Sequence, residues 1–330
     1  MRALQVSGPD AFEIIDLRDP EPSEGEVVIR IGACTICNQH DSRVFAGPHS
    51  TYPLEPGFPG HEAAGEVVAV GPGVKEVAVG DRVVTSGIGG PPLYRELVTR
   101  QEAAVATYRS ETPFAEAAPL ELFGCVHRAV LKASSVRGMR TAVVGLGPAG
   151  LACCQLLSAY GAAEVIALDL REERLAPALE SGATETVLAT RYQPAPEMIA
   201  KRMRGESWTP EEKALAKELE SGLAPLVFEC SGSARSLETS FLLAGQELIV
   251  FGYTTDPVTA WQPVWFAREL TIKNSKILSL DDLRAVAELM DRGRIAPGKL
   301  ISARMAFSQY DKAIAAVRSG QAIKVALSWD

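Results

Sequence analysis

The sequence predicts an α/β protein with a β-rich N-terminal region, a parallel α/β region after it, and a tail that packs back onto the first region. Short segments of alternating polarity recur through the first 110 residues, whereas strands alternate with helices after residue 136. The chain has 330 residues, which is more than one hydrophobic core normally uses. With 47% hydrophobic and 22% charged residues, its composition is that of a globular protein. We therefore expect two domains.

The N-terminal region is expected to form a barrel or sandwich of short strands. Turns rich in Gly and Pro, such as Pro20–Gly25 and Pro53–Gly60, separate the segments. The expected strands are Met1–Val6, Phe12–Leu17, Glu26–Ile31, Gly65–Val70, Asp81–Ser86 and Tyr94–Thr99.

The second region begins with a short apolar strand, Thr141–Val144, followed by a helix, Ala149–Tyr160. Strands that alternate with helices in this way are typical of parallel βαβ units. The further elements expected here are strands at Glu164–Asp169, Thr184–Leu188, Leu226–Cys230, Glu247–Phe251 and Leu270–Lys273, and a helix at Arg171–Ser181.

A polar insert, Met198–Ser221, is expected to form a solvent-exposed helix. Thr209, Pro210 and Glu212 supply the N-cap, the first-turn proline and the capping-box partner of its second half. The tail adds helices at Asp281–Asp291 and Gln309–Ser319, a short segment at Leu300–Ala303 and a strand at Ile323–Trp329. Because this tail is too short to fold alone, we place one domain at residues 1–135 and 277–330 and the other at residues 136–276.

Charge and cysteine content exclude several classes of protein. The chain carries 33 basic and 41 acidic residues, a net charge of −8, without a block of Lys and Arg, which argues against nucleic acid or an anionic membrane as a partner. No apolar stretch reaches membrane-spanning length, and Met1 leads into strand-like sequence without a secretion signal, so we expect a cytoplasmic protein. The six cysteines are too sparse for a disulfide framework and are expected to be reduced thiols.

The strongest motif is Gly145-Leu146-Gly147-Pro148-Ala149-Gly150, which lies between an expected strand and an expected helix. The first glycine permits a tight turn, the second lets backbone amides reach a pyrophosphate, and the third lets the helix approach the sheet. The helix that starts at Pro148 offers unpaired N–H groups from Ala149 onward, together with a positive dipole end, to the phosphates. The motif predicts a bound dinucleotide; the alternative is a glycine-rich turn in another α/β fold.

Asp169 ends the second strand of this region, where a carboxylate can accept hydrogen bonds from the ribose hydroxyls of adenosine. Its charge repels a 2′-phosphate, which predicts NAD(H) rather than NADP(H). Arg171 and Arg174 follow closely and could soften this preference.

A second constellation combines residues that bind transition metals. His61-Glu62 follows the rigid turn Pro56–Gly60, Cys37 precedes it, and Glu121 comes after it. Together these residues can supply a thiolate, an imidazole and a carboxylate to Zn²⁺. Alone, the His-Glu pair could equally be a surface pair.

Here the sequence resembles the zinc-dependent medium-chain alcohol and polyol dehydrogenases, over nearly the whole chain. The segments that carry the resemblance are Gly32–Gly47, Gly60-His61-Glu62, Gly65-Glu66-Val67, Val79-Gly80-Asp81-Arg82-Val83, the glycine motif, Val227-Phe228-Glu229-Cys230-Ser231-Gly232 and Gly320–Leu327. The resemblance implies a GroES-like β-barrel catalytic domain, formed by the N-terminal region and the tail, with a Rossmann doubly wound parallel sheet inserted between them. It also implies a homodimer or homotetramer in which Rossmann sheets join edge to edge.

The resemblance further assigns individual residues. Cys37 matches the first zinc ligand of the family and His61 the second, while Glu62 matches the adjacent carboxylate that lies beside or on the metal. Glu121 resembles the carboxylate that binds zinc, directly or through water, in sorbitol dehydrogenases. Cys125 is an alternative for completing the zinc shell.

Two more residues match positions near the cofactor, and one cysteine is left without a role. Lys324 matches a basic position near the pyrophosphate, and Arg174 matches one near the adenosine ribose. Cys34 is expected to serve in packing only.

The sequence departs from the family in two places. The family usually has a second, structural zinc held by four cysteines, but the segment Thr85–Tyr94 is a short link without cysteine, so one catalytic ion and no structural zinc is expected. The family also often has Ser or Thr two residues after the cysteine ligand, where this chain has Gln39, which cannot relay a proton as a hydroxyl does. We suggest that His40 relays the proton, or that Asp41 orients a ligand.

The sequence therefore predicts a zinc- and NAD-dependent dehydrogenase whose substrate is a small secondary alcohol, such as a polyol, sugar or amino alcohol, or the corresponding carbonyl compound. One alternative is a zinc-free quinone or enone reductase of the same superfamily. Another is a catalytically inactive nucleotide-binding protein that acts as a sensor or structural subunit.

Overall fold

The computed structural model describes residues 1–49 and 51–329 of the chain. These residues form two compact units, Met1–Gly124 with Leu278–Asp330, and Cys125–Ile277. The division falls inside helix α3 (Leu120–Lys132), ahead of the boundary at residue 135 that we expected from the sequence. Among the described residues, no helix is long and apolar enough to cross a membrane.

The first unit is built on a mostly antiparallel sheet whose strand order is β14-β15-β3-β4-β5-β7, with β6 also paired to β3. Strands β1 and β2 form a separate antiparallel pair. The strands are β1 (Arg2–Gly8), β2 (Ala11–Asp16), β3 (Glu26–Thr35), β4 (Glu62–Val70), β5 (Arg82–Ser86), β6 (Leu97–Gln101), β7 (Val105–Thr107), β14 (Ile301–Ala306) and β15 (Lys324–Ser328).

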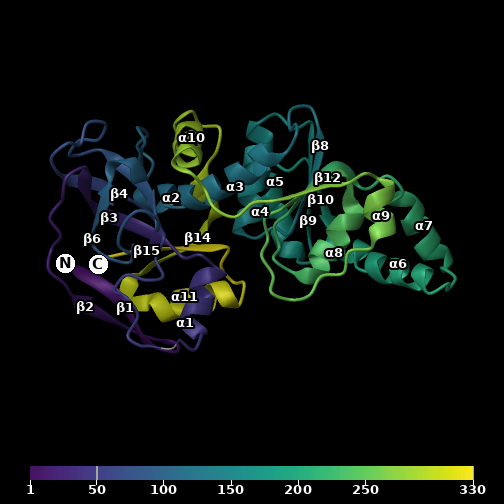
Figure 1. Ribbon diagram of the computed structural model, residues 1–330, viewed down its shortest axis with the longest axis horizontal. Helices are drawn as coiled ribbons and strands as arrows, with labels where there is room; N and C mark the ends of the chain where they lie inside the picture. Colours follow the sequence, from purple (N-terminus) through teal and green to yellow (C-terminus); the bar gives the residue numbers. More distant parts are fainter. Residues whose placement is uncertain (50, 330) are drawn as a thin grey trace. The chain divides into compact units, whose positions relative to one another are not determined.

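The tail completes this sheet, in line with its expected packing onto the N-terminal region. Strand β15 pairs antiparallel with β3 through Leu327 and Cys34, and parallel with β14. Figure 1 shows these yellow strands beside the purple and blue strands of the N-terminal region. The buried core of the unit accordingly contains residues from both segments, such as Ile29, Val67 and Val325.

Several elements of the first unit differ from those expected. Helix α1 (His40–Ala46) was not foreseen, because a helix of seven residues is too short to display a clear helical period. Strand β6 begins at Leu97 rather than at Tyr94, whose backbone N–H instead donates to the carbonyl of Gly57. The remaining helices of this unit, apart from the first turn of α3, are α2 (Phe114–Ala117), α10 (Leu280–Asp291) and α11 (Tyr310–Arg318).

The second unit contains a parallel sheet with the order β10-β9-β8-β11-β12-β13, which is the Rossmann order. The direction in which successive strands are added reverses between β8 and β11, and in folds of this class a nucleotide binds in the crevice at the carboxyl ends of these two strands. The strands are β8 (Arg140–Val144), β9 (Glu164–Asp169), β10 (Glu185–Leu188), β11 (Ala224–Glu229), β12 (Ala244–Val250) and β13 (Thr271–Asn274).

The polar insert forms two helices rather than one. The capping box of Thr209 and Glu212 is present in both directions at the start of the second. The helices of this unit are α4 (Pro148–Ala159), α5 (Leu175–Glu180), α6 (Ala195–Met203), α7 (Pro210–Glu218), α8 (Ala234–Leu243) and α9 (Gln262–Ala267), together with most of α3.

Candidate active site

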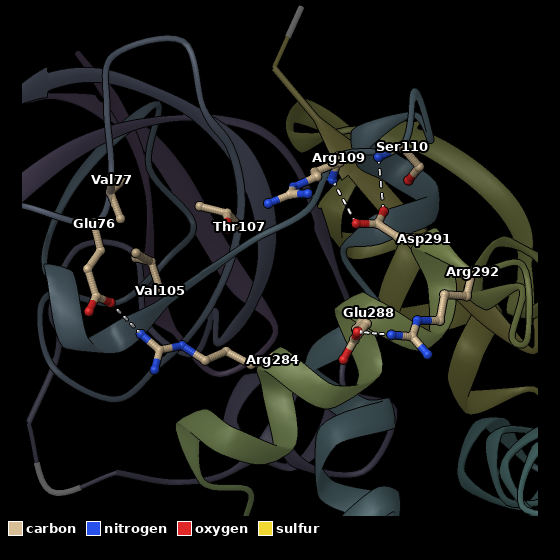
Figure 2. A pocket seen from close by; sticks show the side chains of 10 residues that line it. All are labelled: Glu76, Val77, Val105, Thr107, Arg109, Ser110, Arg284, Glu288, Asp291 and Arg292. Carbon is tan, nitrogen blue, oxygen red and sulfur yellow. Dashed lines mark hydrogen bonds and ion pairs between the residues drawn. The ribbon is translucent and has the colours of Figure 1, made fainter.

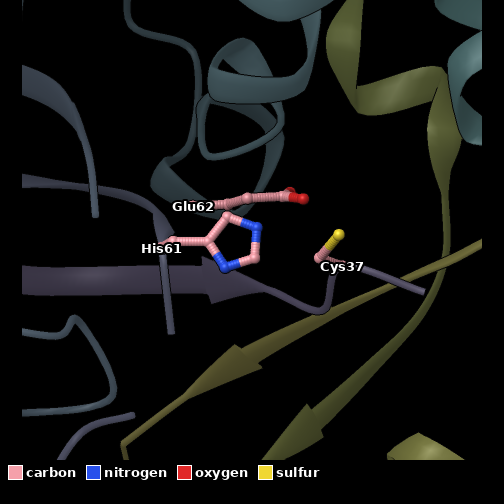
Figure 3. Close-up of side chains that lie close together, drawn as sticks. All are labelled: Cys37, His61 and Glu62. Carbon is pink, nitrogen blue, oxygen red and sulfur yellow. The ribbon is translucent and has the colours of Figure 1, made fainter. Parts of the chain in front are cut away.

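Three side chains from two separate segments of the first unit converge on one point. Cys37 follows strand β3, His61 directly precedes β4, and Glu62 is the first residue of β4. One ligand atom from each of them lies within 4.8 Å of the others. Figure 3 shows the sulfur of Cys37 and the carboxylate of Glu62 on the same side of the His61 ring. The pairing of β3 with β4 brings these residues together across the sheet.

The His61 ring is oriented so that one nitrogen faces the cluster. Its Nδ1 lies 2.9 Å from the carbonyl oxygen of Pro59, a bond in which Nδ1 carries the proton. In the neutral ring Nε2 then carries the lone pair, and Figure 3 shows this nitrogen turned toward Cys37 and Glu62.

Nearby charges control the protonation of His61. Burial lowers the pKa of His61, but its hydrogen bond with Cys37 and the charges of Asp41, Cys37 and Glu121 outweigh burial, and the pKa lies well above the usual value. A metal that binds at Nε2 therefore competes with a proton for this nitrogen.

Asp41 connects the elements around the cluster. Its side chain is fully buried, and its Oδ2 accepts a hydrogen bond of 3.0 Å from the backbone N–H of Cys37 and another from the hydroxyl of Tyr94. Its Oδ1 lies 3.7 Å from Nδ1 of His61. A carboxylate in this place can fix both Cys37 and His61, which is the role suggested above for Asp41.

Glu62 and Lys324 form a buried ion pair. Their nearest atoms are 2.7 Å apart, and both side chains are 1% exposed. The ammonium also donates to the carbonyl of Ile36 at 3.0 Å, while the hydroxyl of Thr35 donates to Glu62. Lys324 was expected near the cofactor pyrophosphate; that role stays a prediction, and the contact that the structure shows is with the carboxylate of Glu62.

Glu121, in the first turn of α3, acts on this cluster through its charge. It raises the pKa values of both His61 and Lys324. Neither of the two groups of potential ligands found among the described residues contains Glu121 or Cys125. Cys34 is buried with its thiol 3.4 Å from the carbonyl of Leu93, as expected for a packing residue.

The donors fit Zn²⁺. A sulfur, an imidazole nitrogen with an available lone pair and a carboxylate are its usual protein ligands. Cys37, His61 and Glu62 present these atoms close enough together to share one ion, and Asp41 accepts a bond from the backbone N–H of Cys37 and lies 3.7 Å from Nδ1 of His61.

His40 lies at the exposed edge of this cluster. Its side chain is 48% exposed, and its Nδ1 is 3.2 Å from Oδ1 of Asp41. Its ring stands edge-on to that of His61, with 5.0 Å between the ring centres. His40 therefore lies beside both Asp41 and His61 and is half-exposed to solvent.

The glycine motif in the second unit has the geometry that phosphate binding requires. Gly145 has φ of +91°, and a Cβ there would meet Ser231. A Cβ on Gly150 would lie 1.9 Å from the carbonyl oxygen of Gly145, so only glycine lets the helix come this close. Gly147 is the N-cap of α4 and has no side chain to bond the first helical N–H groups, which begin at Ala149 because Pro148 has none, so these donors are free for a phosphate.

Asp169 lies at the end of β9, beside this motif. Its carboxylate accepts bonds from the backbone N–H groups of Leu146, at 2.7 Å, and Arg171, at 2.9 Å. The pKa of Arg174 is lowered by burial and by Arg171, and the charge of Asp169 opposes this, so Arg174 lies within electrostatic range of Asp169.

Two family models match the chain. The model described as alcohol dehydrogenase GroES-like domain matches residues 23–108, and the one described as zinc-binding dehydrogenase matches residues 148–292. The chain belongs to the zinc-type medium-chain dehydrogenases. These are oxidoreductases.

Individual members of this medium-chain dehydrogenase family align along the whole chain. The sorbitol dehydrogenase of Halalkalibacterium halodurans is 26% identical and covers 99% of each chain. The crystal structure of 2R,3R-butanediol dehydrogenase from Bacillus subtilis has a TM-score of 0.80 at 23% identity, covering 100% of this chain and 99% of its own. An Escherichia coli CFT073 alcohol dehydrogenase complexed with NADH has the same score, identity and coverage. Both structures support the fold.

The contacts of two residues of this medium-chain dehydrogenase escaped the sequence reasoning. Thr35 and Tyr94 contact Glu62 and Asp41, respectively. No local pattern marks either residue, because each contact depends on how distant strands and turns come together. The position of Thr35 two residues before Cys37 was the one available signal for its proximity.

A cavity of about 770 Å³ in the same unit lies apart from the metal-ligand cluster. Figure 2 shows its charged lining, in which Arg284 pairs with Glu76 at 3.1 Å and Arg292 with Glu288 at 2.5 Å. Neither Cys37 nor a histidine lines it. The candidate active site of this dehydrogenase is therefore the Cys37 cluster.

Proposed function

We propose that this protein is a zinc- and NAD-dependent dehydrogenase that interconverts a secondary alcohol, such as a polyol, sugar or amino alcohol, and its carbonyl product. The observation that carries this proposal is the convergence of Cys37, His61 and Glu62. The relatives named as sorbitol and butanediol dehydrogenases support the substrate class.

Cys37 and Nε2 of His61 would hold the ion, with Glu62 beside it and Glu121 contributing charge. When bound, zinc supplies a Lewis acid that lowers the pKa of an alcohol, and NAD supplies the acceptor for a hydride. The side chains around the site position the groups that would bind the ion. Asp41 fixes the backbone of Cys37 and stands beside the His61 ring, which keeps both ligands in place when the ion is absent.

Lys324 determines how much negative charge Glu62 contributes. Its ammonium balances the buried carboxylate, so that the thiolate of Cys37 and the carboxylate of Glu62 do not stand as two unbalanced anions. We also propose one catalytic ion without a structural zinc, since the link over residues 85–94 contains no cysteine.

Asp169 is proposed to select NAD over NADP, and Asp169→Ser tests this. Removing the carboxylate ends its repulsion of a 2′-phosphate, while Arg171 and Arg174 remain nearby. We expect kcat/KM for NADP⁺ relative to NAD⁺ to rise at least about tenfold, which corresponds to about 1.4 kcal/mol.

Glu173→Gln is the matched control, because Glu173 is an exposed carboxylate paired with Arg171 in the same segment. The control should leave the cofactor ratio unchanged. An unchanged ratio in Asp169→Ser would show that Asp169 does not select the cofactor.

His40 is proposed to pass the substrate proton to solvent. We expect His40→Ala to flatten the pH dependence of kcat while the zinc content stays intact, because His40 is half-exposed and borders the cluster. His49→Ala, which removes a histidine bonded to the carbonyl of Val44, should leave the pH profile unchanged. A wild-type profile in His40→Ala would remove His40 from the relay.

A screen of NAD⁺ reduction with alcohols, polyols and sugars, using zinc-loaded protein, tests the function as a whole. Turnover of a secondary alcohol together with about one zinc per chain by elemental analysis is the expected result. Reduction of quinones or enones by metal-free protein would favour the zinc-free reductase, and cofactor binding without any turnover would favour an inactive nucleotide-binding protein. Light scattering on the same sample tests the proposed homodimer or homotetramer.

A further inference from the structure

The link over residues 86–94, which connects strand β5 to strand β6, begins beside His61 and Glu62. Ser86 stands opposite Glu62 in the pairing of β5 with β4. At the next residue, Gly87, a Cβ would lie 2.6 Å from the Cβ of His61. The first part of the link therefore packs directly against the backbone and side chain of His61.

The far end of the link returns to the other side of His61. The backbone N–H of Leu93 donates to the carbonyl of Gly60 at 2.9 Å. The Tyr94 ring packs so closely on Gly60 that a Cβ there would lie 2.5 Å from it, and the Tyr94 hydroxyl donates to Asp41. The turn that carries His61 is thus enclosed by both ends of the link.

The side chain of Arg100, on β6, joins the start of the link to Pro91, two residues before Leu93. Its guanidinium is 0% exposed and donates to the hydroxyl of Thr85 at 3.2 Å, to the carbonyl of Ser86 at 3.1 Å, and to the carbonyl of Pro91 at 2.7 Å. A third carbonyl, that of Thr99, accepts from Nη1 at 2.8 Å.

The link is shaped around this guanidinium. A Cβ on Gly90 would lie 2.5 Å from Nη1 of Arg100, so the absence of a side chain at Gly90 makes room for the group. A planar fork with five N–H donors can reach several carbonyls at once, whereas a lysine ammonium is a single point with three donors.

Arg100 is held by carbonyl oxygens and a hydroxyl. In the described part of the chain it forms no ion pair with a carboxylate, and burial, helped by the charge of Arg95, lowers its pKa to about 10. It still carries its charge at neutral pH. Burying a cation without a counterion costs free energy of folding. The presence of Arg100 in the core of a β-sheet therefore suggests that the residue has a specific role.

We propose that Arg100 is a positioning residue: by tying Ser86, at the start of the 86–94 link, to Pro91, close to its far end, its guanidinium holds His61 and Glu62 in the arrangement that binds metal. This proposal rests on the proposed zinc-dependent function. Arg100 itself contacts neither His61 nor Glu62, and it acts through the backbone of Ser86, Gly87 and Leu93.

Arg100→Met and Arg100→Lys test the proposal on the full-length protein. Zinc affinity is measured by competition with a chromophoric chelator, and the visible spectrum of the Co²⁺-substituted protein reports the ligand geometry. We expect zinc to bind about 10- to 100-fold more weakly in Arg100→Met, with altered Co²⁺ bands, and a smaller loss in Arg100→Lys. Hydrogen exchange at the amides of Leu93 and Tyr94 should become faster in both variants, independently of any metal.

Arg268→Met is the matched control. Arg268 also donates to backbone carbonyls, those of Leu242 and Ala244 at 2.8 Å, and burial lowers its pKa as well, but it belongs to the nucleotide-binding unit. Its loss should lower the melting temperature without changing zinc affinity or the Co²⁺ spectrum.

Wild-type zinc affinity and Co²⁺ bands in Arg100→Met would overturn the role of Arg100, even if the melting temperature fell, and would leave the proposed function intact. If Arg100→Met does not fold, Gly90→Ala replaces it, because the added methyl group displaces the guanidinium without removing it. Wild-type protein that binds no zinc would instead overturn the proposed function and this inference with it.

Discussion

Cys37→Ala is expected to lose zinc and turnover together. The variant removes the sulfur ligand from a cluster whose three ligand atoms lie within 4.8 Å of one another. Loss of a Lewis acid that stabilises charge on the substrate oxygen should lower kcat/KM at least about a thousandfold, which corresponds to about 4 kcal/mol of transition-state stabilisation. Elemental analysis and initial-rate kinetics measure both effects.

Dialysis of the wild-type protein against a strong chelator should produce the same loss, and added zinc should restore the wild type but not Cys37→Ala. Cys34→Ala is the control, since the Cys34 thiol is buried and bonded to the carbonyl of Leu93. It should retain zinc and activity. Full turnover by metal-free wild-type protein would exclude the metal-dependent mechanism.

Lys324→Met is expected to destabilise the first unit by about 3–5 kcal/mol, because it leaves the carboxylate of Glu62 buried without a counterion. Burial lowers the pKa of Lys324, but the charges of Glu62, Cys37 and Glu121 outweigh it, and the pKa is raised overall. A raised lysine pKa means that the stabilisation is fully present below the unfolded value of about 10.5 and is lost only as the pH rises through the folded value. Urea denaturation of the metal-free protein at pH 7 therefore measures the whole effect.

The double variant Glu62→Gln/Lys324→Met is the control for this measurement. It removes both charges, so no uncompensated ion remains buried, and it should recover much of the stability lost in Lys324→Met. Equal stability of the wild type and Lys324→Met would contradict the prediction.

The nucleotide-binding unit was predictable because its signals are local. The glycine motif places a turn, a phosphate cradle and a close helix–strand contact within six residues, and the steric limits at Gly145 and Gly150 follow from that short segment. The capping box at Thr209 is equally local, and the structure contains it. Helix α1 was missed because its seven residues are too few to show a clear helical period.

The candidate metal site was predictable only in its ligands. Cys37, His61 and Glu62 were picked out by their chemistry and by a family resemblance, but their partners depend on the assembled sheet. Lys324 reaches Glu62 across 262 positions of sequence, through the pairing of β15 with β3. Sequence periodicity carries no information about a contact of this kind.

The way β15 completes the first unit has a consequence for the order of events during synthesis. Strands β3 and β4 are synthesised early. Strand β15, which pairs with β3, and Lys324, whose ammonium neutralises Glu62, are synthesised only after the entire nucleotide-binding unit. Domains generally fold as their sequence becomes available. In a growing chain the nucleotide-binding unit can therefore form first, while the residues of the candidate metal site acquire their final surroundings only after Lys324 has been synthesised.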